Sequence, residues 1–176
     1  MKMDKTKKIV YSSFFIALGI IIPMLFHTIK NFGRAFLPMH IPVLLGGFIL
    51  GPYFGLLVGL ITPFLSSILT GMPPIFPVGI IMFFELSTYG FVSGLFYNKL
   101  KQNEIITLTS AMIIGRIIAA LVVAVLVYGF GAKMPNPFTY IKMAVIVGLP
   151  GIAIQVILIP ILVLSLKRTR ILHETN

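Results

Sequence analysis

The sequence contains no cysteine, and charged residues make up only 10% of its 176 positions. Without cysteine, the chain has no disulfides, no thiolate metal sites and no cysteine nucleophile. It also contains no GxxxxGK[ST], HExxH or GxSxG motif, so the sequence encodes neither ATP hydrolysis nor a familiar membrane hydrolase. If the protein drives a molecule uphill, we expect the energy to come from another subunit or from an ion gradient.

The residues that are present are strongly apolar, with 58% hydrophobic residues and a mean hydropathy of +1.06. The apolar fraction is far above that of a soluble domain, and the charged fraction is far below it. The composition therefore indicates an integral membrane protein. Residues 1–176 have room for one membrane domain of six spans of about 20 residues, and for no soluble catalytic domain.

Helix breakers and charges divide the chain into six predicted spans. They are 8–28, 37–50, 53–70, 78–97, 105–130 and 139–166. All six should be α-helices, because the bilayer offers the backbone no other partners outside a closed barrel, and these runs lack the alternation of a barrel. The second span is short and is bounded by the strings LPMHIP and GP, so we expect a tilted or partly irregular helix inside the bundle.

The cations are distributed unevenly between the two sides of a six-span chain. If the N-terminus is cytoplasmic, nine Lys and Arg residues fall on the cytoplasmic side, against Lys30, Arg34 and Lys133 on the other. This bias predicts that both termini are cytoplasmic. Topology therefore explains the net charge of +10 better than nucleic-acid binding does, because the cations do not share a helical face with interleaved aromatic residues.

Two charged residues, Glu85 and Arg116, are predicted to lie deep in the spans. At 1.5 Å per residue, Glu85 lies about 10 Å below the outer face and Arg116 about 13 Å below it, so the two should be at nearly the same level. One interpretation is a buried ion pair that fixes the register of the fourth and fifth spans. The other is a pocket in the outer half of the bundle, where Arg116 holds a ligand carboxylate or phosphate through a two-pronged hydrogen bond. The two interpretations are compatible.

Hydroxyl groups are expected near this level. Tyr89 lies one helical turn after Glu85 and so near the same face. Thr62, Ser66 and Thr70 recur at four-residue steps in the third span, which places three hydroxyls on one stripe. A hydroxyl in a membrane helix usually donates to its own i−4 carbonyl, so each of these residues has a structural interpretation beside the ligand-binding one.

His40 is expected near the outer end of the second span. It is either a hydrated histidine at a helix end or a residue that contacts or gates a ligand. As a metal ligand it is weak, because no second histidine, cysteine or carboxylate stands at ligand spacing. We predict no metal site.

Small residues recur at four-residue intervals in two places. The first set runs through the second span, the GP turn and the third span, and comprises Gly47, Gly51, Gly55 and Gly59. Such spacing lets helix backbones approach closely, so we expect tight packing of the second and third spans. The second set is Ser13 and Ala17 on the first span, where the partner could be another protein.

Two strings in the chain resemble a known family. They are LPMHIPVLLGGFILGPYFGLLVGLITPFLSSILTGMPPIFP and FELSTYGFVSGLFY. With six spans in under 200 residues, a basic N-terminus and a loop-capped outer pocket, the chain resembles the substrate-binding S component of an energy-coupling-factor (ECF) vitamin transporter, in particular the pantothenate type. The resemblance covers residues 34–97 well and the rest by helix count and hydropathy.

This resemblance implies that a separate transmembrane coupling subunit and two ATPase subunits complete the transporter, so that no cofactor belongs to this chain. It also implies that the S component topples in the membrane to carry its ligand inward. The family carries an AxxxA pair on the first helix for coupling. The corresponding residues here are Ser13 and Ala17, and serine is still small enough for close docking.

The resulting expectation is an all-α, six-helix S component in a bacterial plasma membrane that binds a small water-soluble vitamin, pantothenate first. The alternatives are an S component for a pyrimidine precursor, pyridoxine, folate or a queuosine-type base, a membrane-embedded enzyme using Glu85 or His40 as a base, and a non-transporting scaffold. Arg34 and its loop would form the outer rim of the pocket. The predicted substrate-binding residues are Arg34, His40, Thr62, Ser66, Glu85, Tyr89, Arg116 and Asn136.

Overall fold

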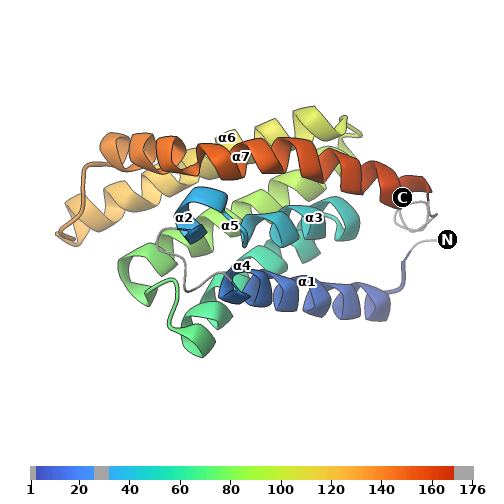
Figure 1. Cartoon of the computed structure of the whole chain (residues 1–176), viewed down its shortest axis with the longest axis horizontal. Helices are drawn as coiled ribbons and strands as arrows, with labels where there is room; N and C mark the ends of the chain where they lie inside the picture. The colour runs from blue at the N-terminus through green and yellow to red at the C-terminus, as the bar shows by residue number, and fades with distance from the viewer. Residues whose placement is uncertain (1–2, 26–31, 169–176) are drawn as a thin grey trace.

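The computed structural model describes residues 3–25 and 32–168, apart from the side chains of Phe32, Arg34, Lys167 and Arg168. Within these residues the chain is helical and contains no strand (Figure 1). The elements are α1 (Lys5–Leu25), α2 (Phe32–Phe36), α3 (His40–Leu50), α4 (Pro52–Thr70), η1 (Ile75–Gly79), α5 (Ile80–Gly94), η2 (Leu95–Lys99), α6 (Glu104–Ala124), η3 (Val125–Gly129) and α7 (Pro137–Arg168). The segments η2 and η3 are single π-helical turns that extend α5 and α6, whereas η1 leads into α5 through a kink at Phe76, whose backbone is extended.

Five helical segments are long and apolar enough to cross a bilayer, and α3 is a shorter apolar helix beside them. The five are Lys5–Leu25, Pro52–Thr70, Ile75–Lys99, Glu104–Gly129 and Pro137–Leu166. The predicted all-helical bundle of six apolar segments is therefore confirmed. The predicted boundaries lie within a few residues of these, and residues 26–28 of the first predicted span lie outside the described residues.

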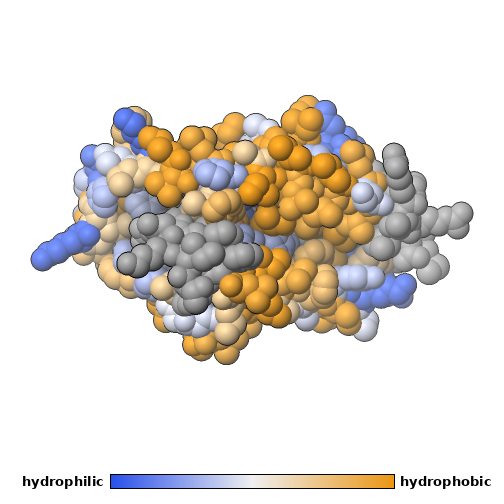
Figure 2. Space-filling model, in the orientation of Figure 1, coloured by the Kyte–Doolittle hydropathy of each residue, from blue (hydrophilic) through white to orange (hydrophobic). Residues whose placement is uncertain are grey.

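The first turn of α1 and the last turn of α7 lie at one end of the bundle, at the right of Figure 1. The connections that follow α4 and η3 lie toward the opposite end. We call these the cytoplasmic end and the outer end, following the predicted topology. Hydrophobic colour covers most of the described surface between the ends in Figure 2, and the strongest hydrophilic colour lies at the ends, as expected for a helix bundle in lipid.

One correction concerns the count of outer cations. Lys142 is exposed in the second turn of α7, toward the outer end, and belongs with Lys30, Arg34 and Lys133. The balance of cations between the two sides is therefore nine against four rather than nine against three. Under the positive-inside rule, it still predicts that both termini are cytoplasmic.

The helical backbone is interrupted at Leu37, the first residue of the second predicted span, which has a left-handed backbone with φ of 50°. The carbonyl oxygen of Leu37 accepts hydrogen bonds from His40 N at 3.0 Å and from Gln155 Nε2 of α7 at 3.5 Å. The short helix α2 precedes this joint, and the 11 residues of α3 follow it. A helix of that length is about 16 Å long, roughly half of a 30 Å hydrocarbon core, so α3 begins inside the bundle. The predicted irregularity of this span is confirmed.

Glycines let α3, α4 and α5 lie against one another without intervening side chains. A Cβ atom at Gly55 would overlap the Gly90 carbonyl oxygen and lie 2.6 Å from Gly47 Cα, and one at Gly59 would overlap the Leu86 carbonyl. The predicted close packing of the second and third spans is therefore confirmed, and α5 is a third partner that the spacing did not reveal. Gly51, with φ of 88°, makes the turn between α3 and α4.

Candidate functional site

Glu85 of α5 and Arg116 of α6 form an ion pair inside the bundle. The Nη1 atom of Arg116 lies 2.8 Å from Oε1 of Glu85, and the two side chains are 15% and 5% exposed. The prediction that the two charges lie at one level is therefore confirmed. An unpaired charge in this position would cost several kcal/mol, so each residue stabilises the other.

Tyr89 joins this pair from the next turn of α5. Its hydroxyl donates to Oε1 of Glu85 at 3.0 Å, so the same carboxylate oxygen accepts from Tyr89 and contacts Arg116. The ring of Tyr89 is 2% exposed and occupies the space beside Gly115, where a Cβ atom would overlap it. The Tyr89 ring can therefore occupy this position only because Gly115, the residue before Arg116, has no side chain.

His40, the first residue of α3, packs against the Tyr89 ring. The two ring centroids are 5.3 Å apart at an interplanar angle of 59°. The His40 side chain is buried at 3% exposure, and among the described residues neither ring nitrogen has a hydrogen-bond partner. Arg116 lies within electrostatic range of His40. The structure therefore brings together four of the predicted site residues, from three helices: His40, Glu85, Tyr89 and Arg116. We call these four residues the polar cluster.

The hydroxyls of α4 are bonded to backbone carbonyls. Thr62 donates to Val58 O at 2.6 Å, which is the i−4 backbone hydrogen bond expected of a structural hydroxyl. Ser66 donates to Met72 O at 2.7 Å, and Ser67 donates to Pro73 O at 2.6 Å, so these serines hold the turn after α4. Each hydroxyl can still accept a hydrogen bond, and the ligand contact predicted for Thr62 and Ser66 stays a prediction.

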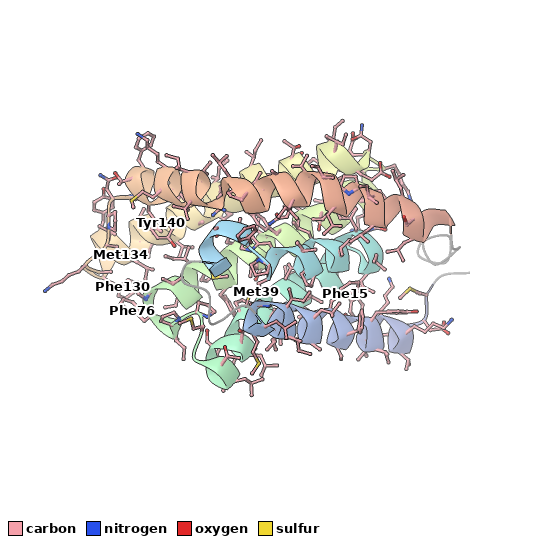
Figure 3. The ribbon with its side chains drawn as sticks, in the orientation of Figure 1. Phe15, Met39, Phe76, Phe130, Met134 and Tyr140 are labelled. Carbon is pink, nitrogen blue, oxygen red and sulfur yellow. The ribbon has the colours of Figure 1, made fainter. Side chains whose placement is uncertain are left out.

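The two remaining predicted residues lie at the outer end. Asn136 caps α7, because its Oδ1 accepts from Thr139 N at 2.8 Å. The backbone of Arg34 belongs to α2, and its side chain lies outside the described residues. Figure 3 shows the labelled side chains of Met134 and Tyr140 at this same end. The ligand contacts predicted for Arg34 and Asn136 stay predictions.

Two residues near the cluster were missed by sequence reasoning. Tyr140 of α7 interacts electrostatically with Arg116, although nothing in its position along the chain indicated this. Gln155 of α7 was not among the predicted site residues. It is buried, and its amide donates to the carbonyl of Leu37, three residues before His40. The only signal for Gln155 was that it is an amide within a long apolar run.

The predicted coupling residues lie on an exposed strip of α1. Ser13 and Ala17 are both exposed, as are Val10, Phe14 and Ile21 along the same helix. The hydroxyl of Ser13 donates to Ile9 O at 3.1 Å, so it is bonded within its own helix. This strip is apolar apart from that satisfied hydroxyl, which suits contact with lipid or with another membrane helix.

Comparison with known proteins identifies a family. Neither a curated protein nor a solved structure was found that matches the chain. The family described as "ECF transporter, substrate-specific component" matches residues 7–163, which is most of the chain and includes the whole polar cluster. Members of this family are transport subunits that associate with an ECF module of ATPase and coupling subunits. The multi-pass helical bundle agrees with that assignment, and the chain belongs to the ECF transporter substrate-specific component family.

Proposed function

We propose that this substrate-specific subunit captures a small water-soluble vitamin from the outer side of the membrane and that Arg116 binds the negative group of that vitamin. The observation that carries this proposal is the placement of an arginine inside a membrane bundle, 15% exposed and paired through Nη1 with Glu85. Ionisable residues inside membrane bundles are rare and costly, and they commonly mark binding sites and substrate pathways.

The chemistry of the guanidinium supports an anionic ligand group. Arginine has five N–H donors in a planar fork, and the contact with Glu85 engages Nη1. We assign the Nε and Nη2 donors to the ligand, because a planar carboxylate can accept two parallel hydrogen bonds from such a fork. Glu85 then serves to orient the guanidinium and to neutralise it while the site is empty.

Pantothenate is the proposed ligand, from the resemblance of residues 37–77 and 84–97 to pantothenate-type S components. It carries a carboxylate, which fits the assignment of Arg116. A pyrimidine precursor, pyridoxine, folate and a queuosine-type base remain the alternatives. All five are polar, and a pocket containing Arg116 accepts carboxylates, phosphates and polarised carbonyls.

The exposed strip of α1 is the proposed docking surface for the coupling subunit. Ser13 and Ala17 are small, so a partner helix can approach the α1 backbone closely at these positions. This chain carries no nucleotide-binding motif, so we propose that the partner ATPases supply the energy.

The test begins with the protein purified in detergent. Mass spectrometry of the small molecules that co-purify, followed by calorimetric titration with pantothenate and the four alternatives, should identify pantothenate as the tightest ligand. Uptake of labelled pantothenate should then require co-expression of the ECF module. If another candidate bound more tightly, that candidate and not pantothenate would be the ligand. Uptake without any ECF module would contradict the proposed mechanism.

A further inference from the structure

His40 is the member of the polar cluster whose chemistry the proposed function leaves unused. Its side chain is 3% exposed, and neither Nδ1 nor Nε2 has a hydrogen-bond partner in the described chain. A neutral imidazole carries one N–H donor and one acceptor nitrogen. Burying both without partners costs free energy that a leucine or phenylalanine at the same position would not cost. The great majority of buried polar side-chain atoms have partners, so this exception requires an explanation.

The contacts made by the nearby polar side chains involve groups other than the nitrogens of His40. The hydroxyl of Tyr89 donates to Glu85, so Tyr89 contacts His40 through its ring. Arg116 has donors only and pairs with Glu85. The amide of Gln155 donates to the carbonyl of Leu37. None of these contacts satisfies the donor or the acceptor nitrogen of the imidazole.

A metal ion does not account for His40. No group of three or more histidine, cysteine, aspartate or glutamate side chains that could hold a metal ion occurs among the described residues. A single imidazole beside a cationic guanidinium is also an unfavourable place for a cation, since Arg116 lies within electrostatic range.

We infer that His40 is a second ligand-binding residue, which pairs through its donor and its acceptor nitrogen with a neutral hydroxyl or amide group of the molecule whose anionic end is held by Arg116. This inference rests on the proposed function and narrows the substrate class to small anions that also carry a hydroxyl or amide. Tyr89 contacts His40 through its ring and Glu85 through its hydroxyl, and Glu85 pairs with Arg116. His40 and Arg116 therefore belong to one cluster, which a single small molecule can contact.

The imidazole and the guanidinium would then select different features of the ligand. Arg116 requires a negative charge, and His40 requires a group that can both accept and donate. A simple aliphatic carboxylate satisfies the first requirement only. Such a carboxylate would leave the two nitrogens of the buried His40 ring without hydrogen-bond partners. It should therefore bind much more weakly than an anion of similar size that carries a hydroxyl or an amide.

The test uses His40→Phe, which keeps a ring and removes both polar atoms, and Thr107→Val as a matched control. The Thr107 hydroxyl is likewise buried without a described hydrogen-bond partner, but it lies about 13 Å along α6 from Arg116, near the cytoplasmic end. In the ligand-free detergent-solubilised protein, both substitutions should raise the melting temperature, because each removes an unsatisfied polar group. A fall in the melting temperature of His40→Phe would overturn the inference, since the imidazole would then be stabilising the unliganded fold.

The binding arm measures affinity for pantothenate by titration and the amount of the small molecule that co-purifies with each variant by mass spectrometry. His40→Phe should weaken pantothenate binding at least about tenfold and reduce the retained molecule, whereas Thr107→Val should change neither. His40→Gln, which restores a donor and an acceptor, should recover part of the affinity. Unchanged affinity and retention in His40→Phe would overturn the inference. If Arg116→Met still abolished binding in that case, the proposed function would stand without it.

Discussion

A Cβ atom on Gly115 would overlap the aromatic ring of Tyr89, so α6 can lie against α5 at this level only because residue 115 has no side chain. The hydroxyl of Tyr89 donates a hydrogen bond to Glu85, and Glu85 pairs with Arg116. Arg116 directly follows Gly115 in the chain. Two consecutive residues of α6 thus serve one arrangement. Gly115 leaves room for the Tyr89 ring, and Arg116 contacts the same carboxylate oxygen of Glu85 that accepts the Tyr89 hydroxyl.

Replacing Gly115 with alanine should therefore disturb the site as well as the packing. The Tyr89 ring is 2% exposed and has little room to move, so we expect a loss of roughly 1–3 kcal/mol in the free energy of unfolding. Gly129→Ala is the control, because the nearest atom to its Cβ, Val125 Cγ1, would be 3.9 Å away. Denaturation in detergent measures both variants, and equal stability of the two would show that the ring contact is not tight.

Arg116→Lys should weaken pantothenate binding by about tenfold or more, although the charge is kept. Lysine offers a single ammonium in place of the planar fork, so it cannot hold a carboxylate through two parallel bonds. Titration of the purified variant measures this effect. Affinity equal to that of the wild type would show that the guanidinium geometry does not contribute to recognition.

Arg116→Met should also destabilise the protein by roughly 3 kcal/mol or more, because it leaves Glu85 buried without its cation. The double variant Arg116→Met with Glu85→Gln removes both charges and should regain most of the lost stability. We expect pantothenate binding to stay absent in the double variant. Recovered stability together with wild-type affinity would instead mean that the pair is purely structural.

Ala17→Leu should leave pantothenate affinity near that of the wild type and abolish uptake by the complete transporter. The larger side chain lies on the exposed strip of α1 and would hold the coupling subunit away from the helix backbone. Ala153→Leu is the matched control, because Ala153 is exposed on α7, away from this strip. Transport of labelled pantothenate measures both variants, and normal uptake by Ala17→Leu would exclude α1 as the docking surface.

Single-cysteine variants test the topology without a prior cysteine-removal step, since the chain has none. Cysteines at Lys30 and Lys133 should react with an impermeant thiol reagent in intact cells, and one at Lys101 should react only after the cells are opened. The reverse pattern would place the polar cluster on the cytoplasmic half of the bundle. It would contradict capture of the ligand from outside.

The Glu85–Arg116 pair was predictable because both residues lie on long regular helices, where depth in the membrane follows from residue number at 1.5 Å per residue. The one-turn spacing of Tyr89 from Glu85 was readable for the same reason. What the pattern could not decide was which oxygen each group uses. That depends on how closely α6 approaches α5, which Gly115 permits by leaving room for the Tyr89 ring.

The break before α3 was not predictable in detail. Leu37 adopts a left-handed backbone that a residue with a Cβ atom rarely takes, and Gln155, far along the chain, helps to hold it. The polar stripe of α4 shows a similar limit. Four-residue spacing placed Ser66 on one face with Thr70, but only the folded turn shows that the carbonyl of Met72 is its partner.

The glycine contacts among α3, α4 and α5 also restrict how the protein can change shape. Sliding any of these helices along another would drive backbone atoms together, because Gly47, Gly55 and Gly90 leave no side-chain layer to yield. Gly115 packs directly against the Tyr89 ring, so α6 is held close to α5 in the same way. We therefore expect α3, α4, α5 and α6 to move as one rigid unit, so that changes of shape that admit or release a ligand involve α1, α2 and α7.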